Sequence, residues 1–176
     1  MDVRVDIDIP CEPSAIYPFV CDLVQYPQWM GLVHSAVLDP TTTGHMAWIV
    51  ELRGKIGPFA RSKRLRMQQV VTDSPHHVRF ERSENDGQQH GQWVLEVKIA
   101  DLGTELVPKS SLKMTLHYGG RLFSSVVERA LQDEIEMSKK RLLDLVMSAK
   151  PTQRIADRLD ARVQVSSQNI PRGWER

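Results

Sequence analysis

One stretch near the C-terminus, residues 122–149, constrains the fold more than any other part of the chain. Its apolar or small side chains recur at steps of three and four residues, the spacing of one face of a helix. These side chains are Phe123, Val126, Val127, Ala130, Leu131, Ile135, Ser138, Leu142, Leu145 and Val146. A helix over the whole stretch would be about 42 Å long, and it needs a large apolar surface to cover.

The pattern also limits what kind of helix this is. The opposite face carries charged residues, among them Glu128, Glu136 and Asp144, whereas a transmembrane helix is apolar all round. A coiled coil is an alternative, but the apolar stripe is wider than the narrow seam of a heptad repeat. We therefore expect the helix to lie against a sheet.

Most of the preceding chain has the alternation of apolar and polar residues that is typical of half-buried strands. The strands are expected near residues 3–9, 33–38, 46–52, 59–71, 78–84, 93–99 and 112–118. Two short helical segments, one beginning near Pro13 and one containing Pro27, separate the first two strands. Because the later strands are joined by short turns, the pattern predicts an α+β protein with an antiparallel sheet of seven strands.

Length and composition narrow the class of protein. A chain of 176 residues is long enough for one domain, expected over residues 1–149, and its net charge of +1 argues against a nucleic-acid partner. The two cysteines and the absence of an apolar core at the N-terminus favour a soluble, cytoplasmic protein. Residues 150–176 are polar and rich in arginine, and are interpreted as a flexible tail or as a segment that docks on a partner.

Three segments together resemble the START-like or SRPBCC superfamily, which includes polyketide cyclase/dehydrase-like proteins. They are IDIPCEPSAIYPFVCDLVQYPQWM, LRGKIGPFARSKRLRM and LHYGGRLFSSVVERALQDEIEMSKKRL. The resemblance implies a helix-grip fold, in which a curved antiparallel sheet wraps around the long C-terminal helix and two short helices close one end. It also implies a hydrophobic ligand between sheet and helix, but the superfamily shares no catalytic signature to transfer to this chain.

The inward face of the predicted strands carries large, adaptable side chains that suit a lipid-like or aromatic ligand. The candidate ligand-binding residues are Trp48, Arg61, Met67, Phe80, Arg82, Trp93, Met114 and Tyr118 on the strands, with Val127 and Leu131 on the helix. For the apolar members, ordinary core packing is the alternative interpretation.

Arg82 and Glu84 share the inward parity of Val78 and Phe80. Buried charges must be paired or hydrogen-bonded, so these two residues either form a buried pair or lie solvated at the end of a strand. With Tyr118, they are the candidate catalytic residues, because such groups polarise a carbonyl. Arg61 and Lys63 raise the same question one strand earlier.

Other chemistry finds little support in the sequence. The six histidines and two cysteines show no metal-ligand spacing, and GKIGP lacks the residues of a phosphate-binding loop, so no metal or cofactor is expected. The basic residues of the run 61–66 alternate between two faces, which favours a solvated strand over a site for phosphate or an acidic carrier protein.

Three functions remain open from the sequence. The first is noncatalytic binding or transport of a small hydrophobic molecule, such as a lipid, quinone or polyketide. The second is a polyketide cyclase or aromatase acting in the same cavity, and the third is a protein-interaction module that uses the basic strand or the tail. The expected assembly is a monomer or a homodimer without a transmembrane segment.

Overall fold

The computed structural model describes residues 2–149 except 43, 57–58, 105 and 120–133, and it does not describe the side chains of residues 54–61. The seven predicted strands and two short helical segments are confirmed. In chain order the elements are β1 (Asp2–Ile9), α1 (Pro13–Val20), the 3₁₀ helix η1 (Leu23–Gln28), β2 (Val33–Leu38), β3 (Ala47–Ile56), β4 (Phe59–Asp73), β5 (His77–Arg82), β6 (Trp93–Asp101) and β7 (Ser110–Tyr118). A helix covering residues 134–149 follows.

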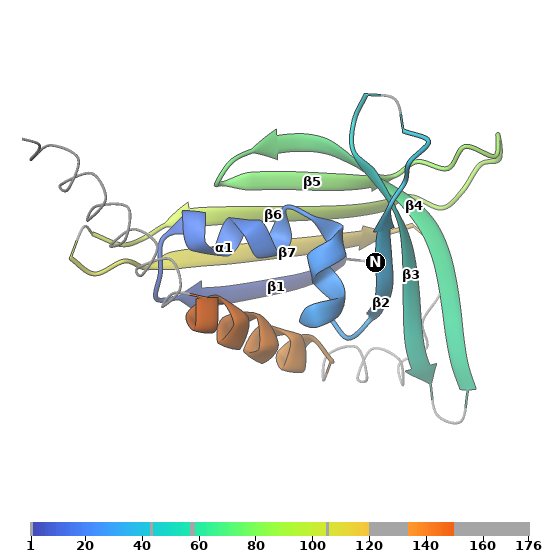
Figure 1. The fold of residues 1–176 in the computed structure, drawn as a ribbon. Helices are drawn as coiled ribbons and strands as arrows, with labels where there is room; N and C mark the ends of the chain where they lie inside the picture. Colours follow the sequence, from blue (N-terminus) through green and yellow to red (C-terminus); the bar gives the residue numbers. More distant parts are fainter. Residues whose placement is uncertain (1, 43, 57–58, 105, 120–133, 150–176) are drawn as a thin grey trace, which may run out of the picture.

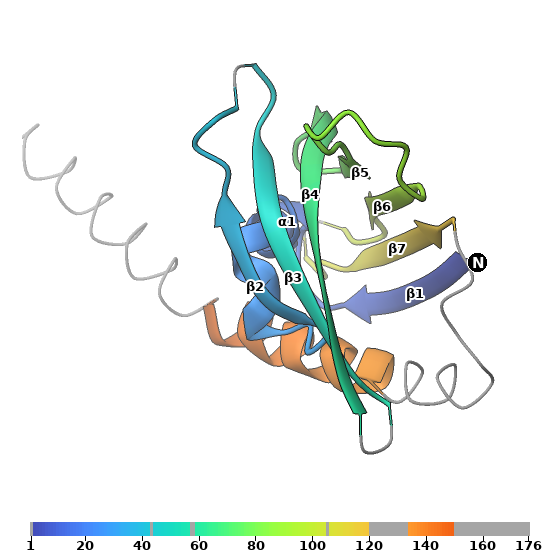
Figure 2. The same cartoon turned by 90° about the vertical axis from the view of Figure 1, so that its right-hand side faces the viewer.

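All seven strands form one antiparallel sheet in the order β1-β7-β6-β5-β4-β3-β2. Strands β2 to β7 each pair with the next strand along the chain. Strand β1 pairs with β7, so the first and the last strand of the chain are neighbours in the sheet. The sheet curls strongly, so that β2 and β3 stand across from β1 and β7 (Figure 2). The predicted α+β class and curved sheet are confirmed.

The helix of residues 134–149 lies on the open side of the curled sheet, near η1 and the edge strands (Figure 1). Leu142 and Val146 on this helix are fully buried in the main core. A side chain at Gly31 would collide with Glu134 and come within 2.9 Å of Arg141 Nη1, so the absence of a side chain permits this close approach. The beginning of the predicted helix, 122–133, and the predicted tail, 150–176, lie outside the described residues.

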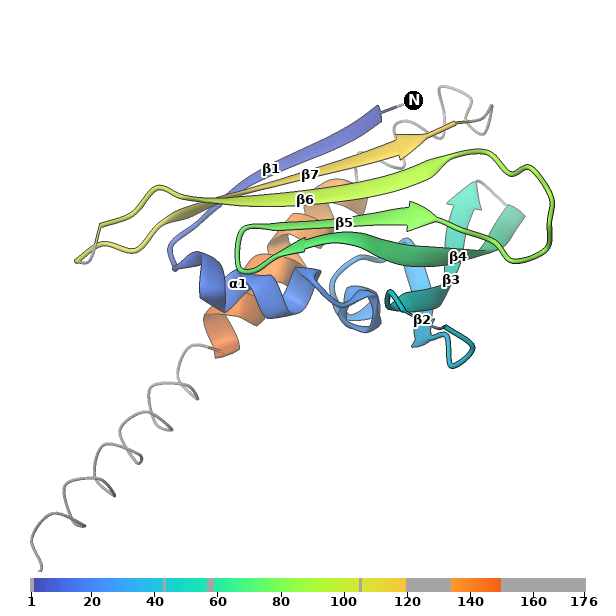
Figure 3. The same ribbon diagram turned by 90° about the horizontal axis from the view of Figure 1, so that it is seen from above.

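The short helices cover the concave face of the sheet, as the view from above shows (Figure 3). Tyr26 of η1 is fully buried, and its hydroxyl donates a hydrogen bond to the Val20 carbonyl at 2.9 Å. Its ring packs against Trp29 and, edge on, against Phe80 of β5. This end of the core is therefore filled by aromatic rings whose polar atoms have partners.

The basic run 61–66 was expected to form a solvated strand, and Arg66 on β4 departs from this expectation. Arg66 is only 8% exposed, because the chain before β3 folds over it and Asp39 forms an ion pair with its Nε at 2.6 Å. The guanidinium also donates to the Ser83 carbonyl and to the Thr42 hydroxyl. A loop that returns over the outer face of a sheet is not visible in the alternation of the strand itself.

None of the helices in the described part of the chain is long and apolar enough to cross a membrane.

Candidate functional site

Polar side chains gather at one end of the inward face, where β5 and β7 finish and β6 begins. Trp93, the first residue of β6, is paired with Tyr118, the last residue of β7, and Arg82 is the last residue of β5. Glu84 follows β5, and Lys63 approaches from β4. We call these five residues the Trp93 cluster.

Arg82 and Glu84 form a largely buried ion pair. Arg82 Nε lies 2.6 Å from Glu84 Oε1, and the two side chains are 9% and 19% exposed. The same carboxylate oxygen accepts a longer hydrogen bond, 3.3 Å, from the backbone N–H of Arg66 on β4. The two charges are therefore paired and mostly removed from solvent, and are not solvated at the end of a strand.

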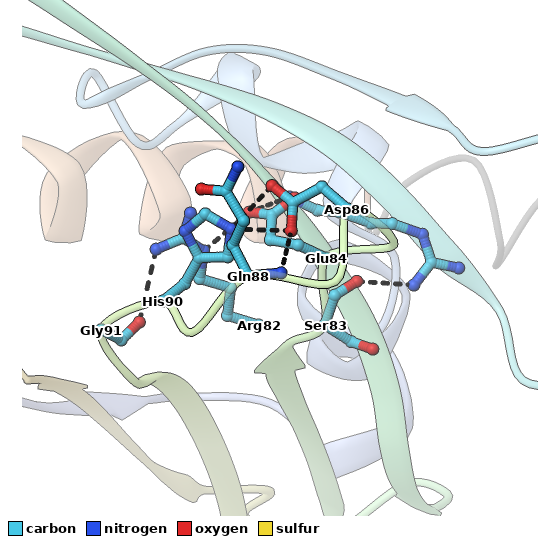
Figure 4. Close-up of polar contacts among 8 residues, drawn as sticks. Arg82, Ser83, Glu84, Asp86, Gln88, His90 and Gly91 are labelled. Atoms are coloured by element: carbon cyan, nitrogen blue, oxygen red, sulfur yellow. Dashed lines mark hydrogen bonds and ion pairs between the residues drawn. The ribbon is translucent and has the colours of Figure 1, made fainter.

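The loop that follows β5 holds this pair in place (Figure 4). Arg82 Nη1 lies 3.4 Å from the Gly91 carbonyl, close to where the loop returns to β6. Within the loop, His90 Nε2 lies 2.8 Å from Asp86 Oδ2, and Asp86 Oδ1 accepts the backbone N–H of Gln88. These bonds lower the pKa of Asp86, the Gln88 N–H having the larger effect.

Lys63 reaches over the end of β5 toward β6 and β7. β5 ends opposite Met67, so the part of β4 that carries Lys63 has no β5 residue beside it. The Lys63 ammonium lies 5.3 Å from the ring centre of Trp93 and 5.4 Å from that of Tyr118, both within cation–π range. The two rings contact each other edge to face, with 4.5 Å between their centres.

The charge on Lys63 has no carboxylate partner within ion-pair distance among the described residues. Glu84 is the nearest candidate, but it is bonded to Arg82. Burial lowers the pKa of Lys63, the positive charge of Arg82 lowers it further, and Glu84 acts weakly in the opposite direction. The cluster thus contains two cations and one carboxylate, which leaves one positive charge uncompensated.

Trp93 differs from the other described tryptophans in its hydrogen bonding. It is 6% exposed, yet no acceptor among the described residues bonds to its indole N–H. By contrast, Trp48 Nε1 donates to Asp22 at 2.9 Å and Trp29 Nε1 donates to the Phe19 carbonyl at 3.1 Å. Buried donors are nearly always satisfied, so an unpaired one indicates that a partner is missing.

A second buried polar atom without a partner lies on the helix. Ser138 is 5% exposed, and its hydroxyl has no hydrogen bond within the described part of the chain. In a helix a serine hydroxyl ordinarily bonds to the carbonyl one turn earlier, as Ser148 does with Asp144. Within the described ranges, the sheet and the helix therefore each present one buried polar group without a partner.

The predicted ligand-binding residues fall into two groups. Trp48 and Phe80 are buried and pack edge to face, and Phe80 also contacts Tyr26 of η1. Met67 is buried between Trp48 on β3 and Arg82 on β5, with which it is paired. Met114, Trp93 and Tyr118 are buried on β6 and β7. Val127, Leu131 and the side chain of Arg61 lie outside the described residues. Their assignment to a ligand site stays a prediction.

The described histidines make separate contacts and do not converge. His77 lies beside Glu96, His90 beside Asp86, and His117 beside Asp2. In the described part of the chain, no three histidine, cysteine or acidic side chains are close enough to hold a metal ion. Cys11 is buried, and burial raises the pKa of Cys21, which makes its thiol less reactive.

The curled sheet, its short helices and the helix on its open side define a helix-grip fold of the START-like class. The family model described as polyketide cyclase / dehydrase and lipid transport matches residues 1–146, so the chain belongs to this family. A comparison with curated protein sequences gave no significant match.

Solved structures share the fold at low sequence identity. A protein from Thermus thermophilus is 18% identical, with a TM-score of 0.63 over 85% of this chain and 99% of that one. The Zhui aromatase/cyclase from a Streptomyces species is 8% identical, with a TM-score of 0.61 over 85% and 94%. A START superfamily protein from Mycobacterium smegmatis is 13% identical, with a TM-score of 0.56 over 84% and 97%.

Proposed function

We propose that the protein binds a small hydrophobic molecule between the curled sheet and the C-terminal helix, without catalysing a reaction. Three features support this function: membership of a family that includes lipid transport proteins, an inward lining of aromatic and methionine side chains, and buried polar atoms without partners among the described residues. A ligand at the Trp93 cluster would contact Tyr118, and it would have to extend along the inward faces of β6 and β7 to reach Met114, which is paired with Val97.

The unpaired indole N–H of Trp93 is the observation that carries the proposal. A buried donor without a partner costs about 1–3 kcal/mol, and the fold could have avoided this with phenylalanine at the same position. A ligand that supplies an acceptor removes the cost on binding. The hydroxyl of Ser138 on the helix, which also lacks a partner among the described residues, is explained in the same way.

The test begins with the protein as purified. Native mass spectrometry and organic extraction should recover an apolar molecule, and a neutral dye such as N-phenyl-1-naphthylamine should bind and be displaced by members of a panel of lipids, quinones and polyphenols. The Trp93→Phe variant should bind acceptor-bearing members of the panel more weakly than wild type. A protein that carries no molecule, binds no dye and gains no thermal stability from the panel would contradict the proposal.

A cyclase or aromatase is the second candidate, and the position of Arg82 favours it. Glu84 fixes the guanidinium at the inward end of β5. The charge of Arg82 acts on Lys63, whose ammonium lies over the rings of Tyr118 and Trp93. A fixed cation of this kind could polarise a substrate carbonyl during ring closure. The similarity to the Zhui aromatase/cyclase is in fold and adds no residue assignment.

Because Arg82 and Glu84 form a buried ion pair, the cyclase function cannot be tested by replacing Arg82 alone. Arg82→Ala would leave Glu84 buried without its cation, so lost activity could follow from lost stability. The double variant Arg82→Gln/Glu84→Gln removes both charges and keeps hydrogen-bonding groups. Incubated with a carrier-bound polyketide, a folded double variant should lose the cyclised products that wild type makes, and an unchanged product profile would reject Arg82 as the polarising group.

A further inference from the structure

A set of hydrogen-bond donors and one excess positive charge meet at the Trp93 end of the inward face. The indole N–H of Trp93 is unpaired, and the ammonium of Lys63 lies over the rings of Trp93 and Tyr118 without a carboxylate in contact, as far as the described residues extend. Arg82, the other cation, is already bonded to Glu84. The indole N–H and the ammonium are both donors, so the ligand atom that complements them is an acceptor.

Charge distinguishes between kinds of acceptor. A neutral carbonyl or hydroxyl would satisfy Trp93 but would leave the ammonium of Lys63 uncompensated among aromatic rings. An anionic oxygen pair serves both groups, because one oxygen accepts from the indole and the other from the ammonium. Aromatic faces on two sides leave the ammonium free to form such a bond without losing its cation–π contacts.

We propose that the ligand is a hydrophobic carboxylic acid whose carboxylate is bound by Lys63 and the indole N–H of Trp93. This inference rests on the proposed binding function and specifies the chemical class of the ligand. Burial and Arg82 lower the pKa of Lys63, and a bound carboxylate opposes both effects. Glu84 is paired with Arg82, and the two charges cancel. Glu84 therefore does not neutralise the charge of Lys63.

The experiment compares acids with their own methyl esters. Dodecanoate with methyl dodecanoate and 2-naphthoate with methyl 2-naphthoate form an aliphatic and an aromatic pair, and affinities are read from displacement of N-phenyl-1-naphthylamine. Wild type should bind at least one acid about ten-fold more tightly than its ester, the gain expected from a charge-assisted hydrogen bond. Acetate, a carboxylate without an apolar part, should not displace the dye at the same concentrations.

Lys63→Met keeps the apolar stem and removes the charge, so it should weaken binding of the acid and bring the ratio of acid to ester affinity close to one. Lys113→Met is the matched control, because Lys113 is an exposed lysine on the outer side of β7, and it should keep the wild-type ratio. Trp93→Phe, which removes only the N–H donor and leaves an aromatic ring, should lower the ratio by a smaller factor. Circular dichroism and thermal unfolding verify that each variant is folded.

The outcomes separate this inference from the function on which it rests. Equal binding of acid and ester by wild type, or an acid preference that survives Lys63→Met, would overturn the carboxylate site while leaving hydrophobic binding intact. Failure of the dye, both acids and both esters to bind wild type would overturn the inference and the proposed function together.

Discussion

Two tryptophans on the inward face of the same sheet have opposite hydrogen-bonding states. Trp48 of β3 is 1% exposed, packs edge to face on Phe80 and donates its N–H to Asp22. Trp93 of β6 is almost as buried and packs in the same way on Tyr118, but its N–H has no acceptor in the described part of the chain. The difference separates a region whose polar atoms are bonded within the fold from one in which, under the proposed function, a ligand would supply the missing acceptor.

The surroundings of each ring support this division. Around Trp48, the polar atoms of the neighbouring Tyr26 and Trp29 rings are bonded. Around Trp93, Lys63 contributes an unmatched charge and the Arg82–Glu84 pair is buried at a cost in desolvation. Proteins tolerate such local costs at functional sites.

The largest expected effect is a difference in stability between two matched substitutions. Trp48→Phe leaves a cavity and removes a hydrogen bond to a charged partner, so it should lower the free energy of unfolding by about 3 kcal/mol. Trp93→Phe removes a donor that has no partner among the described residues, so it should cost about 1 kcal/mol or less. Urea unfolding of both ligand-free variants measures the difference, and equal losses would remove the distinction between the two regions.

A smaller effect concerns the buried pair beside Trp93. Arg82→Met leaves the Glu84 carboxylate largely buried with one weak backbone bond, and should lower the free energy of unfolding by about 2 kcal/mol. Arg82→Met/Glu84→Gln removes both charges and should regain at least half of that loss. The same urea experiment measures both variants, and a double variant that is less stable than the single one would show that the pair itself stabilises the fold.

The smallest expected effect is a pH dependence of the free energy of unfolding, caused by Asp39, which lies outside the Trp93 cluster. Bonds from Arg66, and then from Thr41, lower the pKa of Asp39 from 3.8 to about 2. Because this pKa is lower in the folded protein than in the unfolded chain, the carboxylate stabilises the fold above about pH 4, and this contribution disappears as the pH falls toward 2.

Asp39→Asn removes the titrating group, so the variant should be less stable than wild type at about pH 6, and the gap should narrow as the pH falls toward about 2. Thermal unfolding across this range measures the gap. A constant gap between the two proteins would mean that the Asp39–Arg66 pair does not contribute in this way.

The sequence predicts the fold well because each strand carries its own periodic signal and each turn its own residues. The inward positions of Trp48, Phe80, Trp93 and Tyr118 follow from alternation alone, and all four are buried. The ion pair of Arg66 with Asp39 could not be predicted, because it joins a strand to a loop that returns over it. Local periodicity contains no information about such a contact.

The Trp93 cluster was predictable only in part. Parity placed Arg82 and Glu84 on the inward face but left open whether they form a buried pair or lie solvated at the end of a strand, and the structure shows the pair. Two features of the cluster depend on where β5 ends relative to β4 and β6: the unpaired N–H of Trp93 and the position of Lys63 over two rings. The sequence does not predict the end of this strand to within one residue. These two features, which carry the proposals on function, came from the structure.

The indole N–H signals of the four tryptophans test the central claim most directly. Isotope-labelled protein, with signals assigned from tryptophan-to-phenylalanine variants, is titrated with dodecanoate and observed by NMR. The Trp93 signal should move downfield as its N–H gains an acceptor, while those of Trp48 and Trp29 should stay close to their original positions. Saturating dodecanoate that shifts Trp48 and leaves Trp93 in place would contradict the account.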